Sequence, residues 1–199
     1  MDKWINASEW ERSWWGNCVN TLGEELKQLV YAKYMKLEMV RTPKSPYNIN
    51  LDGKSVLDIG GGPVSLLLKS INGGRMVVID PQNIPYWTTL RYQELGIDYI
   101  PTQGEVLGEL GIFDEVWLYN VLQHTEDPPK IAKNALKQGK TIRVFEWINT
   151  KINIGHPHSL TADGLDSWFN GTGQIKSLEG EGNCWGDCWF GIFKGDNYE

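Results

Sequence analysis

Two of the three histidines lie one residue apart, in the stretch NIGHPHSL at residues 153–160. Imidazole rings bind metal ions and exchange protons near neutral pH. His156 and His158 could therefore be metal ligands, an acid and base pair, or polar residues that cap the helix-like stretch at residues 160–169. The choice depends on what the rest of the chain places around them.

A glycine-rich stretch, VLDIGGGPVSLLLK at residues 56–69, carries the most specific pattern in the chain. It predicts a buried strand that ends at Asp58, a loop of three glycines, and a helix that begins near residue 63. Glycines let a ligand approach the backbone because they carry no Cβ atom. The amides of the helix N-terminus would then face that ligand with partial positive charge.

Asp80 ends the next predicted strand, and a carboxylate there can accept hydrogen bonds from both hydroxyls of a ribose. A glycine loop followed by such an acid occurs in nicotinamide enzymes and in enzymes that use S-adenosylmethionine. Ser65 stands where the dinucleotide fingerprint has its third glycine. Asp58 would repel a pyrophosphate but suits a ligand with an amino group and a sulfonium. The pattern therefore favours S-adenosylmethionine.

Short apolar runs alternate with helix-like stretches from residue 55 onward. We predict strands over residues 55–60, 75–80, 98–101, 113–122 and 140–149, and helices over residues 64–71, 86–95, 104–110 and 129–139. This alternation predicts an α/β fold with a Rossmann-like seven-stranded sheet, mostly parallel, and helices on both faces. Ligands of such sheets bind beyond the carboxyl ends of the strands.

The two ends of the chain are expected to complete this fold. Thr21 and Glu24 have the spacing of a capping box, so we predict a helix that begins at Thr21 and stops before Pro43. Residues 182–195 predict a C-terminal antiparallel hairpin that turns at Gly186-Asp187.

Five stretches in order, VLDIGGG, VVIDP, PTQGE, FDEVWLYNVLQHTEDP and FEWIN, resemble the class I S-adenosylmethionine-dependent methyltransferases, most closely the small-molecule-type members. The resemblance covers roughly residues 50–150. In that family the glycine loop holds the methionine part of the cofactor and the acid after the second strand holds the ribose. The segment after the third strand borders the adenine, and the segment after the fourth forms the pocket floor.

The resemblance implies S-adenosyl-L-methionine as cofactor and a set of residues that bind it. These are Asp58, Gly60, Gly61, Gly62, Asp80, Pro81, Gln103, Gly104, Glu105, Asn120, Val121 and Leu122. The stretch TQGEVL departs from the family pattern and leaves open whether Gln103 or Glu105 faces the adenine.

All three histidines are expected at one edge of the sheet, beside the methyl donor, because the strands that precede them are neighbours. A general base adds about 10²–10⁴-fold to the rate when the acceptor is a hydroxyl. We predict that His156 or His124 is this base and that Gln123 and His158 contact the substrate. The alternatives are that His124 only orders the following TEDPP turn and that HPHS only caps the next helix.

Residues 1–48 are expected to form an N-terminal helical cap, and residues 49–199 one compact methyltransferase core. Trp10, Trp14 and Trp15 fall in this cap, where aromatic walls would shield a sulfonium and stabilise it by cation–π contact. We predict that Trp15 contacts the ligand and that the other two rings pack as core.

A metal site is the weaker interpretation of the histidines. Cys184 and Cys188 with His156 and His158 would supply four zinc ligands, but the H-x-H spacing is short and the cysteines are expected to straddle the hairpin turn. The pair His156 and His158 with Glu146 is a second possible ligand set. We predict no metal.

The expected function is transfer of a methyl group from S-adenosylmethionine to a small-molecule acceptor, at oxygen rather than nitrogen, by in-line displacement. An RNA or protein methyltransferase, or a cofactor-binding module without catalysis, stays an alternative. The net charge of −6 argues against nucleic acid and membranes as partners. Three cysteines without a secretory signal predict a cytoplasmic protein with reduced thiols.

Overall fold

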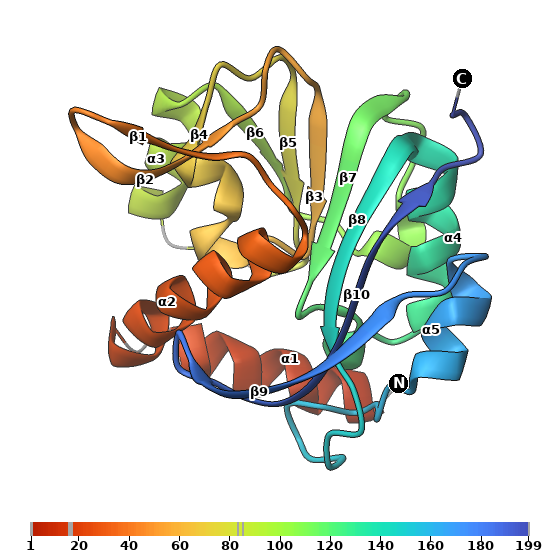
Figure 1. The fold of residues 1–199 in the computed structure, drawn as a ribbon. Coiled ribbons are helices and arrows are strands. Elements are labelled where there is room, and N and C mark those ends of the chain that lie inside the picture. Colours follow the sequence, from red (N-terminus) through yellow and green to blue (C-terminus); the bar gives the residue numbers. More distant parts are fainter. Residues whose placement is uncertain (1, 16–17, 83, 85, 199) are drawn as a thin grey trace.

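A seven-stranded sheet forms the centre of the protein (Figure 1). The structure, a computed structural model, describes residues 2–15, 18–82, 84 and 86–198. The strand order is β6-β5-β3-β7-β8-β10-β9. The bounds are β3 Val56–Ile59, β5 Met76–Ile79, β6 Ile97–Ile100, β7 Phe113–Tyr119, β8 Gly139–Trp147, β9 Gln174–Glu181 and β10 Cys184–Lys194. The first five strands in this order are parallel and β10 is antiparallel to both its neighbours, so the predicted fold class is confirmed.

Helices cover both faces of the sheet because its central strands are apolar on both sides. In β3, Val56 packs with α2 (Cys18–Tyr34) and α3 (Tyr86–Glu94), while Leu57 packs with α4 (Pro128–Gln138) and α5 (Ala162–Trp168) on the opposite face. Such strands carry continuous apolar runs rather than alternating ones. No helix among the described residues has the length and apolar character needed to cross a membrane.

Two predicted helices are only short turns. Residues 62–69 form two 3₁₀ turns, η1 (Gly62–Val64) and η2 (Leu66–Lys69), followed by the short strand β4 (Ser70–Ile71), because Ser65 between them is extended. In the other stretch only η3 (Gly104–Val106) is helical. There the side chain of Asn134 on α4 donates to the carbonyls of Gly104 and Glu105, which fixes these residues against α4 instead of in a longer helix.

The N-terminal region differs from the prediction at both ends of its helices. An additional helix, α1 (Asp2–Trp15), precedes α2, and α2 begins at Cys18 rather than at Thr21. The side chain of Thr21 lies outside the described residues. After α2 the chain turns at Lys36, which has a φ of 54°, into a hairpin of β1 (Met39–Thr42) and β2 (Ser45–Asn50). This hairpin, which pairs with β4, was not predicted.

The C-terminal hairpin is present, but its turn lies earlier than predicted. Gly182 and Asn183 connect β9 and β10 with φ values of 57° and 64°, which suits a tight two-residue hairpin turn. Gly186 and Asp187 lie inside β10. Cys184 and Cys188 therefore do not straddle the turn, and both are buried free thiols.

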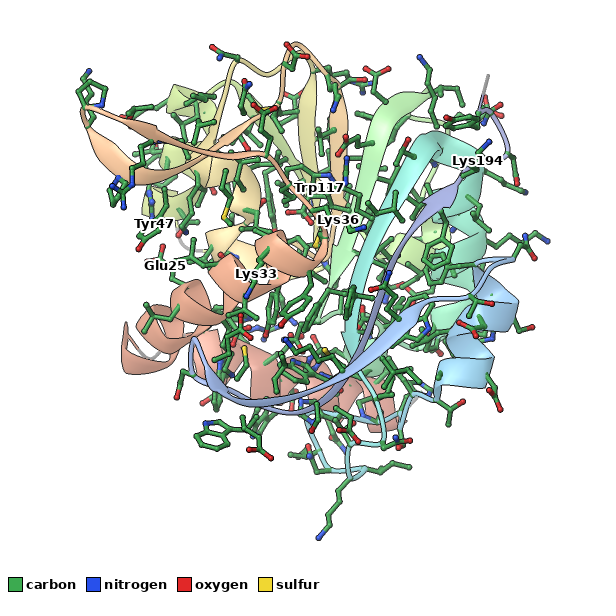
Figure 2. The ribbon with its side chains drawn as sticks, in the orientation of Figure 1. Glu25, Lys33, Lys36, Tyr47, Trp117 and Lys194 are labelled. Atoms are coloured by element: carbon green, nitrogen blue, oxygen red, sulfur yellow. The ribbon has the colours of Figure 1, made fainter. Side chains whose placement is uncertain are left out.

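A buried charge cluster joins α2 to the sheet below the cavity end. Glu115 on β7 accepts hydrogen bonds from Arg143 Nε at 2.6 Å and Nη2 at 3.0 Å, from Trp117 at 2.9 Å, and from Lys54 at 3.1 Å. Arg143 also donates to the carbonyls at the end of α2, near Lys36 (Figure 2). Burial opposes the ionisation of Glu115, but these donors hold its pKa below the ordinary value.

Replacing Glu115 with alanine should lower the free energy of unfolding by about 3–5 kcal/mol, because it leaves the Arg143 guanidinium without its buried partner. Urea denaturation measures this loss. The exposed carboxylate of Glu109 provides the control, and Glu109→Ala should change stability by less than about 0.5 kcal/mol. Equal stability of the two variants would show that the cluster does not anchor α2.

Candidate functional site

A cavity of about 910 Å³ lies at the carboxyl ends of β3, β5, β7 and β8. This is the edge where parallel α/β sheets bind ligands, and the volume is that of a small-molecule site. The other walls come from α1, from α2, from the loop after β8 and from the start of β10. Segments from both ends of the chain therefore close the site.

The glycine loop forms one wall and has no room for side chains. Gly60 and Gly62 have positive φ values, 77° and 55°. A Cβ atom on Gly60 would lie 2.1 Å from Cγ2 of Val121, and one on Gly61 would lie 2.6 Å from Oδ2 of Asp58. The conformation and the close packing both require glycine.

Asp58 lies beneath this loop and does not line the cavity. Its Oδ2 accepts hydrogen bonds from Ser65 and from Tyr119, both at 2.5 Å, while Oδ1 is buried without a partner. Burial raises the pKa of Asp58 to about 7, and the charge of Asp80 adds to this effect. The structure thus gives Asp58 contacts that organise the loop.

The amides after the loop do not face the cavity as a helix N-terminus. The Ser65 amide donates to the hydroxyl of Tyr92 at 3.1 Å, and the Leu66 amide donates to that of Tyr119 at 3.0 Å. The expected helix dipole is therefore absent, because the turns are short and their first amides already have side-chain acceptors.

Asp80 lines the cavity beside the loop, together with Pro81. Its Oδ2 accepts the Gly62 amide at 3.1 Å and its Oδ1 accepts the Gln82 amide at 2.8 Å. Burial, and then the nearby carboxylate of Glu11, raises the pKa of Asp80 to about 7. The loop and the acid that the sequence pairs across a strand and a turn thus meet directly.

The segment after β6 also reaches the cavity. Gln103, Gly104 and Glu105 all line it. Oε1 of Glu105 accepts the amides of Glu126 and Asp127 at 2.9 and 3.2 Å, so this carboxylate already holds the loop before α4.

The floor after β7 is shaped by a buried carboxylate. Glu146 accepts the amides of Val121 and Leu122, both at 3.1 Å, and burial raises its pKa to about 8. Val121 lines the cavity, whereas Leu122 is fully buried beneath it.

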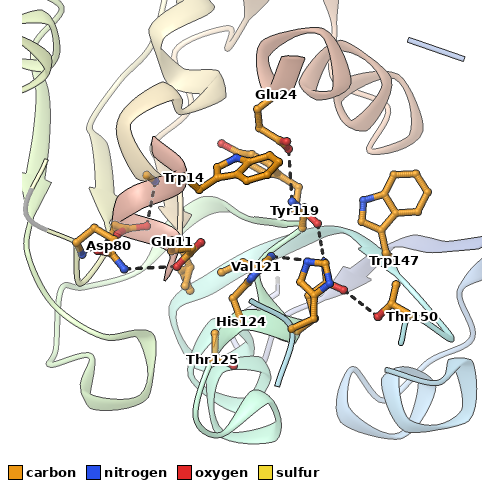
Figure 3. A pocket seen from close by; sticks show the side chains of 18 of the residues that line it. Glu11, Trp14, Glu24, Asp80, Tyr119, Val121, His124, Thr125, Trp147 and Thr150 are labelled. Carbon is orange, nitrogen blue, oxygen red and sulfur yellow. Dashed lines mark hydrogen bonds between the residues drawn. The ribbon is translucent and has the colours of Figure 1, made fainter. Parts of the chain in front are cut away.

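A chain of polar side chains crosses this floor (Figure 3). Thr150 donates to Gln123 at 3.2 Å, Gln123 donates to Asn120 at 2.8 Å, and Asn120 donates to Glu24 on α2 at 3.4 Å. Tyr31 and Lys27 donate to the same carboxylate of Glu24. The network fixes the orientations of Asn120 and Gln123, which both line the cavity.

His124 and His156 meet at the cavity wall, with ring centroids 4.8 Å apart. Nδ1 of His124 lies 2.6 Å from the carbonyl of Gly155, which can only accept, so Nε2 is the nitrogen that is free to accept a proton. Burial lowers the pKa of His124. Burial, and then the charge of His124, lowers the pKa of His156 to about 4. Both rings are neutral at neutral pH.

The third histidine points elsewhere. Nε2 of His158 lies 2.9 Å from the carbonyl of Thr125, and His158 does not line the cavity. The N-cap of α5 is Thr161, whose side chain accepts the Gly164 amide, so neither histidine caps this helix. Among the described residues, no three His, Cys, Asp or Glu side chains are grouped as they would be to hold a metal ion.

Four tryptophans of α1, Trp4, Trp10, Trp14 and Trp15, line the cavity. Trp10 and Trp14 stack at 5.2 Å, and they are only half-buried, so they do not pack as core in the way the sequence suggested. Trp15 lies against the glycine loop, 3.7 Å from where a Cβ on Gly62 would be.

Other cavity residues were missed by the sequence analysis. The largest group is Ser8, Glu11, Glu24, Gln82 and residues 183–187 of the C-terminal hairpin. On α1 a signal existed, because Trp4, Ser8, Glu11 and Trp15 recur at helical spacing and share one face. Glu24 was instead interpreted as a helix cap.

Comparison with known proteins gives the fold but no relative in sequence. No family model and no curated protein matches the chain. The N-methyltransferase NodS from Bradyrhizobium japonicum WM9, in complex with S-adenosyl-L-homocysteine, is similar in structure with 15% identity over 86% of this chain and 88% of that chain, at a TM-score of 0.60.

Two further solved structures share the fold. Magnesium protoporphyrin IX methyltransferase (ChlM) from Synechocystis PCC 6803, with bound SAM, matches with 14% identity over 72% of this chain and 71% of that chain, at a TM-score of 0.53. The 1,6-didemethyltoxoflavin-N1-methyltransferase from Burkholderia thailandensis matches with 16% identity over 72% of each chain, at a TM-score of 0.54. It carries bound 1,6-didemethyltoxoflavin and S-adenosylhomocysteine.

Gly60→Ala should destabilise the protein by about 2–5 kcal/mol, because left-handed strain and overlap with Val121 add together. Gly96 is a matched control, since its φ is also positive, 68°, but nothing lies within 4 Å of its Cβ position. Gly96→Ala should cost only about 1–2 kcal/mol. Urea denaturation compares the two, and equal losses would show that Val121 does not constrain the loop.

Proposed function

We propose that this protein is an S-adenosylmethionine-dependent methyltransferase that acts on a small molecule. The observation that carries the proposal is the single cavity in which Gly60, Gly62 and Asp80 lie opposite His124 and His156. The fold supports it, since the three structural neighbours named above are methyltransferases and were solved with S-adenosylmethionine or S-adenosylhomocysteine.

The residues present fit this cofactor. The glycine loop is a cradle that a Cβ atom would fill, which leaves its backbone open to a ligand. The described lining residues include five carboxylates, Glu11, Glu24, Asp80, Glu105 and Asp187, and one cation, Lys27. An acidic wall suits a ligand that carries an ammonium and a sulfonium group.

Each wall then has a role in holding the cofactor. Gly60–Gly62 would bind the methionine part, Asp80 the ribose, and Gln103 and Gly104 the adenine, with Asn120 and Val121 as the floor. Trp15, against the glycine loop, would contribute cation–π contact. When bound, S-adenosylmethionine supplies a methyl group on a positively charged sulfur.

We propose a hydroxyl as the methyl acceptor. A hydroxyl must lose its proton as the methyl group arrives, and Nε2 of His124 is oriented to accept it. Nδ1 of His156 lies 3.2 Å from the amide nitrogen of Asn153, which donates, so Nε2 of His156 carries the hydrogen that can bind the acceptor. His124 would therefore be the base and His156 the residue that positions the acceptor.

A small acceptor is favoured by the closure of the site. α1, as part of the proposed N-terminal cap, covers the cavity on one side, and Trp185 and its neighbours on β10 cover another. A nucleic-acid target would need an open, basic groove, and Lys27 is the only lysine or arginine among the described lining residues.

S-adenosylhomocysteine should bind the wild-type chain in titration calorimetry, and Asp80→Ala should weaken this binding about 10–100-fold, because charge-assisted hydrogen bonds to the ribose are lost. Asp98, exposed on β6, provides the control, and Asp98→Ala should bind as tightly as wild type. An undiminished affinity in Asp80→Ala would contradict the assigned cofactor site.

His124→Ala should lower kcat about 10²–10⁴-fold while the affinity for S-adenosylhomocysteine is retained. The neutral imidazole is the active form, so kcat/KM should be flat at neutral pH and fall as pH drops below 6.5, since the pKa of His124 is lowered from that value. A fall centred near pH 4 would assign the base to His156 instead.

His158→Ala is the matched control for this experiment, because His158 lies outside the cavity and should leave kcat unchanged. Substrate turnover with candidate hydroxyl and amine acceptors is the measurement. Binding of the cofactor without turnover of any acceptor would support a binding module in place of an enzyme.

A further inference from the structure

Two carboxylates from distant parts of the chain lie side by side in the cavity. Asp80 follows β5 and Glu11 lies on α1, and Figure 3 shows their side chains next to each other. The charge of Glu11 raises the pKa of Asp80. Lys27, the only lysine or arginine among the described lining residues, pairs with Glu24 instead. Like charges placed so close require hydrogen-bond donors between them.

Gln82 connects the two carboxylates and adds a third acceptor. Its amide donates to Asp80 at 2.8 Å, and its side-chain nitrogen donates to Glu11 at 3.4 Å and to the hydroxyl of Ser8 at 3.1 Å. Its side-chain oxygen is buried and has no hydrogen-bond partner, although Gln82 lines the cavity. A buried acceptor without a partner is costly, so the site is built for a ligand rich in donors.

The arrangement of these acceptors matches one chemical group. Each carboxylate oxygen of Asp80 already accepts one backbone amide and retains a second lone pair. Glu11 accepts a single long hydrogen bond from Gln82. A vicinal diol presents two hydroxyl donors on neighbouring carbons, so it can satisfy two adjacent carboxylates at once.

We propose that Glu11 is a second ribose-binding carboxylate, so that Asp80 accepts one hydroxyl of the cofactor ribose and Glu11 accepts the other. This inference rests on the proposed function. It also makes α1 part of the cofactor site, because the ligand would join β5 to the cap that carries Trp15 and Ser8. Binding of the cofactor then orders the cap over the acceptor side of the cavity.

Burial of the two acids agrees with this role. Burial raises the pKa of Glu11 to about 7, Gln82 lowers it, and the charge of Glu24 raises it further. Hydroxyl donors favour the ionised form of a carboxylate. A bound diol would therefore compensate the cost of holding Glu11 and Asp80 together.

The test is titration calorimetry with S-adenosylhomocysteine and its 2′-deoxy and 3′-deoxy analogues. Glu11→Gln keeps the shape of the side chain and removes its charge, and it should weaken binding of S-adenosylhomocysteine about 10–100-fold. With the analogue that lacks the hydroxyl bound by Glu11, variant and wild type should bind within about twofold of each other. Asp80→Asn should show the same behaviour with the other analogue.

Glu9→Gln is the matched control, since Glu9 is an exposed acid on the same helix and its loss should not change affinity. A weakening in Glu11→Gln that is equal for all three ligands overturns the proposal and leaves Glu11 a packing role in the cap. Unchanged binding of S-adenosylhomocysteine by this variant also overturns it, while the proposed function stands. A wild-type chain that binds none of the three ligands overturns both.

Discussion

The carboxylate of Asp58 joins the three elements that must meet for the cavity to form. It sits at the end of the central strand β3, accepts Ser65 after the glycine loop, and accepts Tyr119 at the end of β7. The Tyr119 hydroxyl in turn accepts the Leu66 amide. Because the loop is held from below by this cluster, its glycines can leave the upper side to a ligand. The buried acid therefore acts on the ligand through the shape of the loop.

The acidic groups around the cavity have a cost that only a ligand explains. Burial raises the pKa values of Asp58 and Asp80 to about 7 and that of Glu146 to about 8. Glu146 repays part of this cost by holding the amides of the floor loop. Asp80 and Glu11 have no such structural return beyond a few amides, and sites that store cost in this way are where proteins bind and react.

The sequence predicts well what local pattern and chain order decide. The five parallel strands and the meeting of Gly62 with Asp80 follow from apolar runs and from the topology that such runs allow. The short turns after the loop do not follow, because Ser65, Tyr92 and Tyr119 meet only in the folded chain. The hairpin turn was displaced for a similar reason, since both glycine pairs fit a turn and strand pairing selects one.

Burial gives the two cavity histidines opposite tendencies. It keeps both rings neutral at neutral pH, which a base requires, and it weakens them as bases as their pKa values fall. Gly155 resolves the conflict for His124, because its carbonyl binds Nδ1 and stabilises the ring after Nε2 accepts a proton. The same residue packs against Trp10 of α1, where a Cβ atom would lie 2.5 Å from the indole. The placement of the proposed base and of the cap over the cavity thus depends on one glycine in the loop after β8.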